Sequence, residues 1–214
     1  MIKILVVDDH DLVRTGFVRM LGDIDGFDVV GEADSGEKAV VLARELQPDI
    51  VLMDVKMPGI GGLEATKKLI NAHEGLRVIV VTALDDAMYP SRLMQAGAYG
   101  YLTKGTALDE MVMAIKTVHK GKHYMSNNIA QQMALKSYAK DTRTPFEKLS
   151  ERELQTALMI ANGQKPQAIA NTFNVSPKTV NSYRYRIFDK LEISSDVELA
   201  LLAVKHGVLD VEIE

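Results

Sequence analysis

The chain has 214 residues, of which 47% are hydrophobic and 25% charged, the profile of a soluble globular protein with one or two domains. It has no cysteine, which excludes disulfides, thiol nucleophiles and zinc–thiolate sites. Its formal net charge of −4 argues against non-specific coating of nucleic acid, so any DNA contact must come from a local basic surface. The sequence shows no membrane-spanning apolar run and no signal-peptide pattern, which fits a cytoplasmic protein.

The first 120 or so residues alternate between strand and helix patterns. Apolar, mostly β-branched runs indicate strands of a parallel sheet that is buried on both faces. These strands are expected at Ile4–Val7, Val29–Ala33, Ile50–Met53, Val78–Val81 and Tyr99–Leu102. Helical patterns follow them at Leu12–Leu21, Glu37–Leu46, Leu63–Ala72, Ala87–Ala96 and Leu108–His119. The alternation predicts a doubly wound α/β domain with a five-stranded parallel sheet over residues 1–120.

A linker is predicted over residues 121–147. It contains one expected helix at Ile129–Lys136, and the stretch Ser137–Lys148 is polar, carries Pro145 and lacks periodicity. Beyond it the strand signals end, and we expect an all-α, four-helix domain over residues 148–210. Its helices are predicted at 151–162, 166–173, 177–190 and 195–206, the first of them opened by a capping box of Ser150 and Glu153.

Polar residues follow four of the predicted strands, where ligands of open α/β sheets bind. They are Asp8, Asp9, Asp54, Thr82 and Lys104. Three crowded carboxylates repel one another unless a cation joins them, and oxygen ligands without sulfur indicate Mg²⁺. Such a site suits phosphoryl transfer, in which Asp54 attacks, Lys104 pairs with a phosphoryl oxygen and Thr82 donates a hydrogen bond.

Each residue taken alone has an ordinary explanation as well. A single acidic residue after a strand is often a helix cap, and Lys104 fits an exposed surface lysine. The joint placement of all these residues at one rim favours the functional interpretation.

The first 120 residues also resemble response-regulator receiver domains, which have a flavodoxin-like fold. The motifs that carry the resemblance are Val6-Val7-Asp8-Asp9-His10, Leu52-Met53-Asp54-Val55-Lys56-Met57-Pro58-Gly59, Val81-Thr82-Ala83 and Gly100-Tyr101-Leu102-Thr103-Lys104. The resemblance implies that Asp54 accepts a phosphoryl group from a phosphohistidine of a sensor kinase. It implies that Asp9, Asp54 and the backbone carbonyl of Lys56 hold the metal, with Asp8 acting through water.

The resemblance further implies that Thr82 and Lys104 sense the phosphoryl group and that Tyr101 is a switch aromatic. An aromatic side chain in an edge strand is most often simple packing, so the role of Tyr101 rests on the resemblance alone. Gly105 stands where receivers often have proline, and the cis peptide usual at that point is therefore not carried over.

The third helix of the C-terminal part has two distinct faces. Its core face is expected to hold Val180, Tyr183, Ile187 and Leu191 at helical spacing. The segment 176–191 carries a basic surplus on an otherwise acidic chain, which suits a helix in the major groove of DNA. A solvated amphipathic helix explains the same charges, but the short helix and tight turn before it favour a helix-turn-helix.

The C-terminal part also resembles LuxR/FixJ-type DNA-binding domains. The resemblance rests on Leu149-Ser150-Glu151-Arg152-Glu153, Ile169-Ala170, Val175-Ser176-Pro177-Lys178-Thr179-Val180 and Lys190-Leu191. It implies that Asn181, Ser182 and Tyr185 reach bases. It implies that phosphates are held by Lys178, Thr179, Arg184 and Arg186. Lys165-Pro166 departs from the usual pattern, which leaves backbone contacts at the start of that helix open.

The order of the two parts matches the NarL/FixJ response regulators, with detail most similar to GacA/UvrY-type global regulators. This resemblance implies transcription control of targets that include small regulatory RNA genes. The implied partners are a sensor histidine kinase, double-stranded DNA and RNA polymerase, with no membrane.

The last predicted helix is apolar nearly all round. A symmetric partner is the simplest cover for its second side, so we expect a homodimer seam that includes Val197, Leu201 and Val204. Complete burial within one domain explains the same pattern equally well.

The sequence disfavours two other functions. A Mg²⁺-dependent aspartyl phosphotransferase needs a second carboxylate two residues after its nucleophile, and Lys56 occupies that position, so we predict that the chain is not an enzyme. An RNA-binding or protein-docking output is disfavoured by the helix-turn-helix signal.

Overall fold

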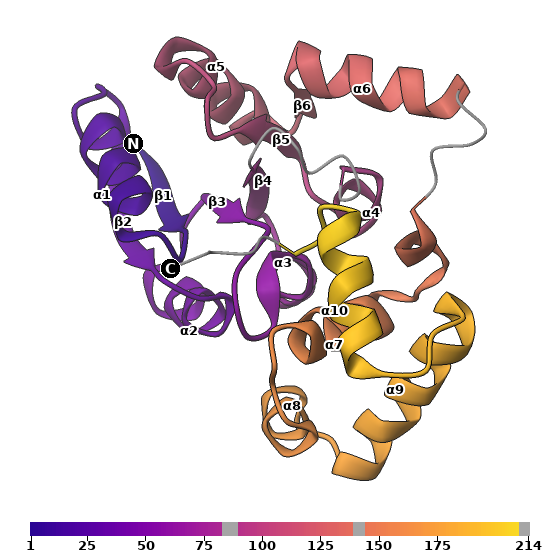
Figure 1. Cartoon of the computed structure of the whole chain (residues 1–214). Coiled ribbons are helices and arrows are strands. Elements are labelled where there is room, and N and C mark those ends of the chain that lie inside the picture. Colours follow the sequence, from indigo (N-terminus) through magenta and orange to yellow (C-terminus); the bar gives the residue numbers. More distant parts are fainter. Residues whose placement is uncertain (83–89, 139–143, 210–214) are drawn as a thin grey trace. The chain divides into compact units, whose positions relative to one another are not determined.

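The computed structural model describes residues 1–82, 90–138 and 144–209. The chain divides into two compact units, residues 1–138 and residues 139–214, and each is described by itself (Figure 1). The helix that the sequence predicts within the linker, α6 (Asn127–Tyr138), is grouped with the first unit. No helix among the described residues is long and apolar enough to cross a membrane.

The first unit is built on a parallel sheet with strand order β2-β1-β3-β4-β5-β6. The strands are β1 (Ile2–Val7), β2 (Phe27–Ala33), β3 (Ile50–Asp54), β4 (Arg77–Thr82), β5 (Gly100–Thr103) and β6 (Tyr124–Met125). The connecting helices are α1 (Asp11–Gly22), α2 (Gly36–Leu46), α3 (Gly61–Ala72), α4 (Pro90–Gln95) and α5 (Leu108–His119). The doubly wound α/β fold predicted from the sequence is confirmed.

The predicted number of five strands needs correction, because the sheet has six. β6 pairs in parallel with β5, with Tyr124 opposite Gly100 and Met125 opposite Tyr101. It has two residues, too few to give an apolar run or an alternation that a sequence pattern can detect. The first part of the helix predicted at Ala87–Ala96 lies outside the described residues, and residues 90–95 of that range form α4.

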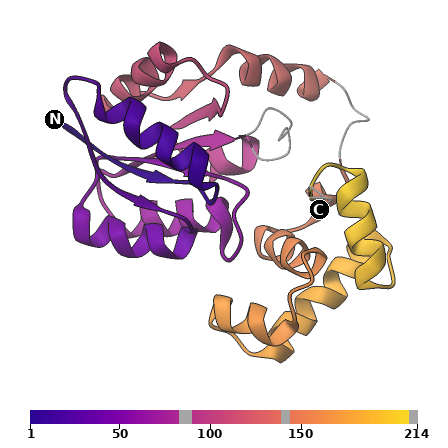
Figure 2. The same cartoon turned by 60° about the vertical axis from the view of Figure 1, so that its left-hand side comes forward.

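The sheet is covered on both faces, as its continuous apolar strands require. Successive side chains of a strand point to opposite faces, so Ile4 and Val6 of β1 face one helical layer and Leu5 and Val7 the other. The first group lies in one buried cluster with residues of α1 and α5, such as Phe17. In Figure 2, α1 in indigo and α2 in purple lie on opposite faces of the sheet. This double cover leaves the strand ends as the accessible part of the sheet.

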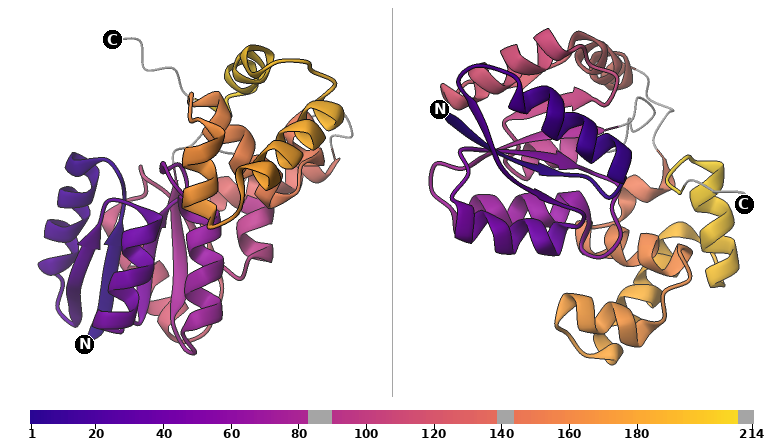
Figure 3. Two further views of the ribbon diagram at one scale, coloured as in Figure 1. Left: turned by 90° about the horizontal axis from the view of Figure 1, so that it is seen from below. Right: turned by 90° about the vertical axis from the view of Figure 1, so that its left-hand side faces the viewer.

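The second unit is all-helical, as predicted, with α7 (Glu151–Ala161), α8 (Pro166–Phe173), α9 (Pro177–Leu191) and α10 (Asp196–Lys205). Figure 3 shows these helices in orange to yellow. The capping box is present: Glu153 N donates to Ser150 Oγ at 3.4 Å, and Ser150 N donates to Glu153 Oε2 at 2.8 Å. Ser176 caps α9 by accepting from Thr179 N at 3.1 Å.

The last part of the predicted linker is ordered structure instead. Pro145–Lys148 form the 3₁₀ helix η1, in which Phe146 is fully buried and contacts His206 edge to face. A single buried aromatic side chain thus ties this segment to the helical core, and a polar, aperiodic stretch gives no sign of it. Of the predicted core face of α9, Val180, Ile187 and Leu191 are buried while Tyr183 is only half-buried.

Candidate functional site

The polar residues predicted to share one rim are brought together by the sheet. β1, β3, β4 and β5 are consecutive and parallel, so their carboxyl ends meet at one edge. Asp8 follows β1, Asp54 and Thr82 end β3 and β4, and Lys104 follows β5. Asp8 and Asp54 are 1% and 3% exposed, so this is a pocket of buried charge rather than a solvated surface.

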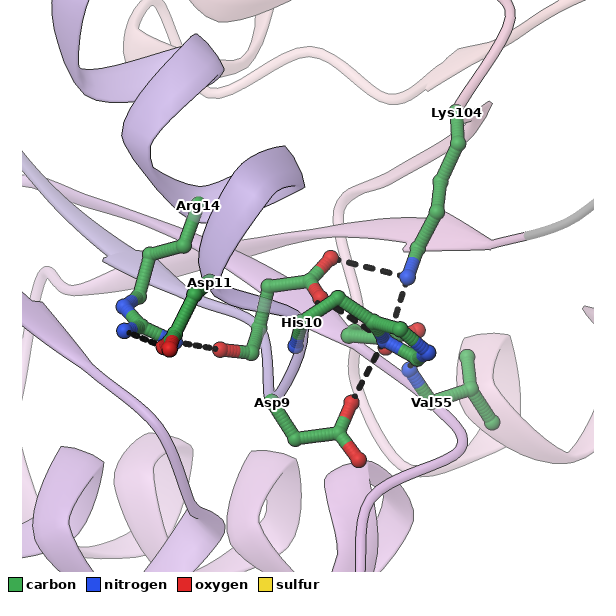
Figure 4. Close-up of polar contacts among 8 residues, drawn as sticks. Asp9, His10, Asp11, Arg14, Val55 and Lys104 are labelled. Atoms are coloured by element: carbon green, nitrogen blue, oxygen red, sulfur yellow. Dashed lines mark hydrogen bonds and ion pairs between the residues drawn. The ribbon is translucent and has the colours of Figure 1, made fainter. Parts of the chain in front are cut away.

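Lys104 neutralises part of that buried charge. Its ammonium lies 2.8 Å from Asp8 Oδ2 and 2.9 Å from Asp54 Oδ2. Figure 4 shows dashed lines for polar contacts that end on the Lys104 ammonium. The other oxygen of Asp54 accepts a hydrogen bond from Val55 N at 2.7 Å. Burial of two carboxylates becomes tolerable because each has a cationic or N–H partner.

The balance of these effects shows in the pKa values. The pKa of the Asp54 carboxyl is raised to about 6: burial is the main cause, Lys104 opposes the rise and the neighbouring Asp8 adds to it. Burial lowers the pKa of Lys104, but its contacts with Asp54 and Asp8 outweigh this and raise it overall. Lys104 therefore stays charged at neutral pH and favours the ionised, nucleophilic form of Asp54.

Asp8, Asp9, His10 and Asp54 each offer a ligand atom within 4.8 Å of the others. Oxygen atoms dominate this donor set, which suits a hard divalent cation. The side chain of Asp9 is 26% exposed, which leaves the cluster open toward solvent on its side. Lys56 lies two residues after Asp54 and is half-buried; its predicted role as a carbonyl ligand stays a prediction.

Two residues at this edge were not singled out from the sequence. His10 Nδ1 lies 2.9 Å from Asp9 Oδ1 and 3.2 Å from Asp8 Oδ1, and its backbone N donates to Asp8 Oδ1 at 2.9 Å. Arg14 Nη1 donates to the backbone carbonyl of Asp8 at 2.7 Å and pairs with Asp11 (Figure 4). The position of His10 directly after the aspartate pair could have been used to predict its place at the site. The contact of Arg14 with a backbone carbonyl leaves no pattern in the sequence.

Besides Lys104, two residues with a predicted phosphoryl-sensing or switch role lie in the neighbouring strands β4 and β5. Thr82 is 2% exposed at the end of β4, and its carbonyl accepts from Lys104 N at 2.7 Å. Tyr101 is 1% exposed within β5, and its carbonyl accepts from Ser126 N at 3.1 Å. Tyr101 therefore lies in the strand that precedes Lys104, and Thr82 ends the neighbouring strand β4. Residues 83–89 after Thr82 lie outside the described part.

α9 presents most of its predicted contact residues outward. Lys178, Ser182 and Arg186 are exposed, and Tyr185 is 69% exposed. Thr179 and Asn181 are half-buried. Asn174 has a φ of +53°, a left-handed conformation that makes the sharp turn between α8 and α9. The geometry is that of a helix-turn-helix whose second helix can enter a groove.

Arg184 has a different environment from the other predicted phosphate contacts. Its guanidinium pairs bidentately with Asp196 at 2.7 and 3.0 Å and lies 4.8 Å from the ring of Phe188. It thereby ties α9 to the first turn of α10. A phosphate contact by Arg184 would compete with this ion pair, so we assign it first a structural role.

The predicted seam residues on α10 are uncovered. Val197 is 69%, Leu201 66% and Val204 40% exposed, whereas Leu199 and Ala203 of the same helix are buried. The interpretation that this helix is completely buried is therefore wrong for these three side chains.

The chain is similar to known proteins over nearly its whole length. Residues 4–116 match the response regulator receiver domain, and residues 147–203 match the bacterial regulatory proteins of the luxR family. It is 63% identical over 211 residues to the response regulator GacA of Pseudomonas aeruginosa, covering 98% of this chain and 99% of GacA. It is 53% identical over 213 residues to the response regulator UvrY of Escherichia coli, covering 99% and 98%.

Among solved structures, the RcsB response regulator of Salmonella typhimurium has a similar fold. Its TM-score is 0.75 at 22% sequence identity, and the match covers 96% of this chain and 98% of RcsB.

Proposed function

The chain belongs to the two-component response regulators that join a receiver domain to a LuxR-type DNA-binding domain, and on that premise we propose that phosphorylation of Asp54 controls its binding to DNA. The observation that carries the proposal is Asp54 itself, buried at the end of a central strand with Lys104 at 2.9 Å. A sensor histidine kinase is the proposed donor.

The residues of the pocket divide the work of phosphoryl transfer. Asp54 supplies the attacking carboxylate oxygen, which Lys104 keeps ionised. Asp9, Asp54 and the Lys56 carbonyl would hold Mg²⁺, with Asp8 acting through water, and the bound ion would neutralise charge on the transferred group. The phosphoryl group carries about −1.5 to −2 charges in place of the single negative charge of the Asp54 carboxylate, and Lys104 and Thr82 respond to this change.

The charge change would reach the output through β4 and β5. Lys104 exchanges Asp8 for the phosphoryl group, and its backbone already bonds to Thr82 across these strands. Tyr101, buried in β5 next to β6, lies on the same route. We propose that this rearrangement changes how well the DNA-binding domain engages its site.

The DNA-binding part of the proposal rests on the outward face of α9. Lys178 and Arg186 would hold phosphates, while Asn181 and Tyr185 would read base edges. The exposed apolar side chains of α10 would form a homodimer seam on DNA. The same proposal includes targets among small regulatory RNA genes and RNA polymerase as a partner. It also includes a cytoplasmic location and the absence of enzymatic turnover.

Labelling with a small phosphodonor such as acetyl phosphate tests the acceptor assignment. With Mg²⁺ present, intact-mass spectrometry should find one added phosphoryl group on the parent protein and none on Asp54→Asn. EDTA should abolish the labelling of the parent. An Asp54→Asn protein that is labelled at the yield of the parent would overturn the assignment.

A further inference from the structure

The loop between β3 and α3, residues 55–60, carries the carbonyl that the proposed metal site requires. Its first half is fixed by its own backbone, since Met57 N and Gly62 N both donate to the carbonyl of Val55, at 3.2 and 3.0 Å. Gly62 lies so close to Asp54 that a Cβ there would collide with the Asp54 carbonyl. The start of α3 is thus held against the end of β3.

The second half of the loop is held from a different helix. Glu37, in the first turn of α2, accepts a hydrogen bond from Ile60 N through its Oε1 at 3.0 Å. Its carboxylate also lies directly against Gly59, where an added Cβ would collide with Oε1. Gly59 and Gly61, on either side of Ile60, have φ values of +76° and +66°. Such a backbone turn presents N–H groups to an anion.

The Glu37 carboxylate therefore acts on the backbone of the loop, at Gly59 and Ile60, and not on a side chain of the pocket. α2 and α3 pack together beside it, and Gly36 lies close to Ile60, so the carboxylate has a fixed base from which to hold the loop. Because the Glu37 side chain is exposed, its position is not explained by hydrophobic or core burial.

We infer that Glu37 is a positioning residue for the cation site: it holds the 55–60 loop in the conformation in which the Lys56 carbonyl and the Asp9 and Asp54 carboxylates bind one metal ion together. The inference rests on the proposed function, because it concerns the same site. Neither the family matches nor the motifs of the pocket assign a role to Glu37. Mutating a residue that hydrogen-bonds to a metal ligand typically lowers metal affinity about 10- to 100-fold. Glu37 acts through backbone, so we expect a smaller effect of about 3- to 10-fold.

The test compares three variants of the full chain by calorimetric titration with Mg²⁺. Glu37→Ala should raise the Kd for Mg²⁺ about 3- to 10-fold, and Glu37→Gln should raise it less, because the amide oxygen still accepts from Ile60 N. The control is Glu45→Ala, an exposed glutamate near the other end of α2, which should bind Mg²⁺ as the parent does. Circular dichroism on each variant checks that it is folded.

A second readout separates positioning from general damage. With acetyl phosphate at saturating Mg²⁺, Glu37→Ala should be labelled at close to the rate of the parent, since excess metal compensates for weaker binding. Unchanged Mg²⁺ affinity in Glu37→Ala, or an equal loss in Glu45→Ala, would overturn the inference. Failure of the parent itself to bind Mg²⁺ or to be labelled would instead refute the proposed function.

Discussion

Replacing Lys104 with alanine removes the ammonium that lies between the two buried carboxylates. In the parent, the pKa of Asp54 is raised to about 6, chiefly by burial and despite the opposing effect of Lys104. Without it, Asp54 faces Asp8 with less compensation, and both side chains are at most 3% exposed. We therefore expect the pKa of Asp54 in the metal-free variant to lie higher than in the parent.

The size of the rise follows from the contact geometry. Two unit charges roughly 4 Å apart interact by about 4 kcal/mol at an effective dielectric constant of about 20, which corresponds to about 3 pKa units. The Lys104 side chain is 21% exposed, and water entering the vacated space solvates the carboxylates, so a rise of about 1–2 units is expected. At pH 7 a large share of the variant would then carry a protonated Asp54.

The assay is a ¹³C NMR titration of the aspartate carboxyl carbons in EDTA, with the Asp54 signal assigned by its loss in Asp54→Asn. Lys120→Ala, which removes an exposed lysine at the end of α5, is the matched control and should leave the titration unchanged. A pKa of Asp54 in Lys104→Ala equal to or below that of the parent would refute the reasoning. It would mean that solvent, not Lys104, stabilises the ionised form.

Further predictions concern the second unit. Arg186→Ala should weaken binding to all duplexes alike and reduce the slope of log affinity against log salt by about one unit, as measured by fluorescence anisotropy. Tyr185→Ala should instead relax preference at particular base pairs, by roughly 1–3 kcal/mol of discrimination, in a panel of single-substitution sites. Val204→Glu should abolish dimers on DNA in gel-shift experiments while labelling at Asp54 persists; a dimer that survives places the seam elsewhere. Glu153 is buried, which raises its pKa, but the Lys190 ammonium at 2.6 Å and the Ser150 N–H outweigh this and lower it. Since the pKa is lowered by folding, the stabilisation is present above the unfolded pKa and is lost as pH falls through the folded value. Lys190→Ala should therefore cost a few tenths to about 1 kcal/mol of unfolding free energy at pH 7 and progressively less in acid denaturation series below pH ~4.5; an undiminished cost in acid would contradict the ion pair.

The sequence predicted those parts of the fold that depend on repeated patterns. The buried strands appear as continuous apolar runs, and the parallel order that follows from them places Asp8, Asp54 and Lys104 at one edge. Capping at Ser150 was predicted because its pattern is local. These features share one property: each can be recognised from a pattern of residues that lie close together in the sequence.

The features that the sequence did not predict depend on single long-range contacts. β6 is defined by the pairing of two residues with β5. η1 is held by the buried side chain of Phe146, which packs into a core made of residues that follow it in the sequence. Glu37 and Arg14 act on backbone atoms, which have no residue-specific pattern to recognise. Arg184 fits a phosphate contact by position, and only the structure shows its pairing with Asp196.

The most direct test of the central claim is the affinity of the full-length protein for DNA sites selected from random duplexes, measured with and without acetyl phosphate. Parent and Asp54→Asn are compared in the same Mg²⁺-containing buffer. The phosphodonor should change the DNA affinity of the parent and leave that of Asp54→Asn unchanged. An Asp54→Asn protein that responds as the parent does, or a labelled parent whose affinity does not change, would contradict it.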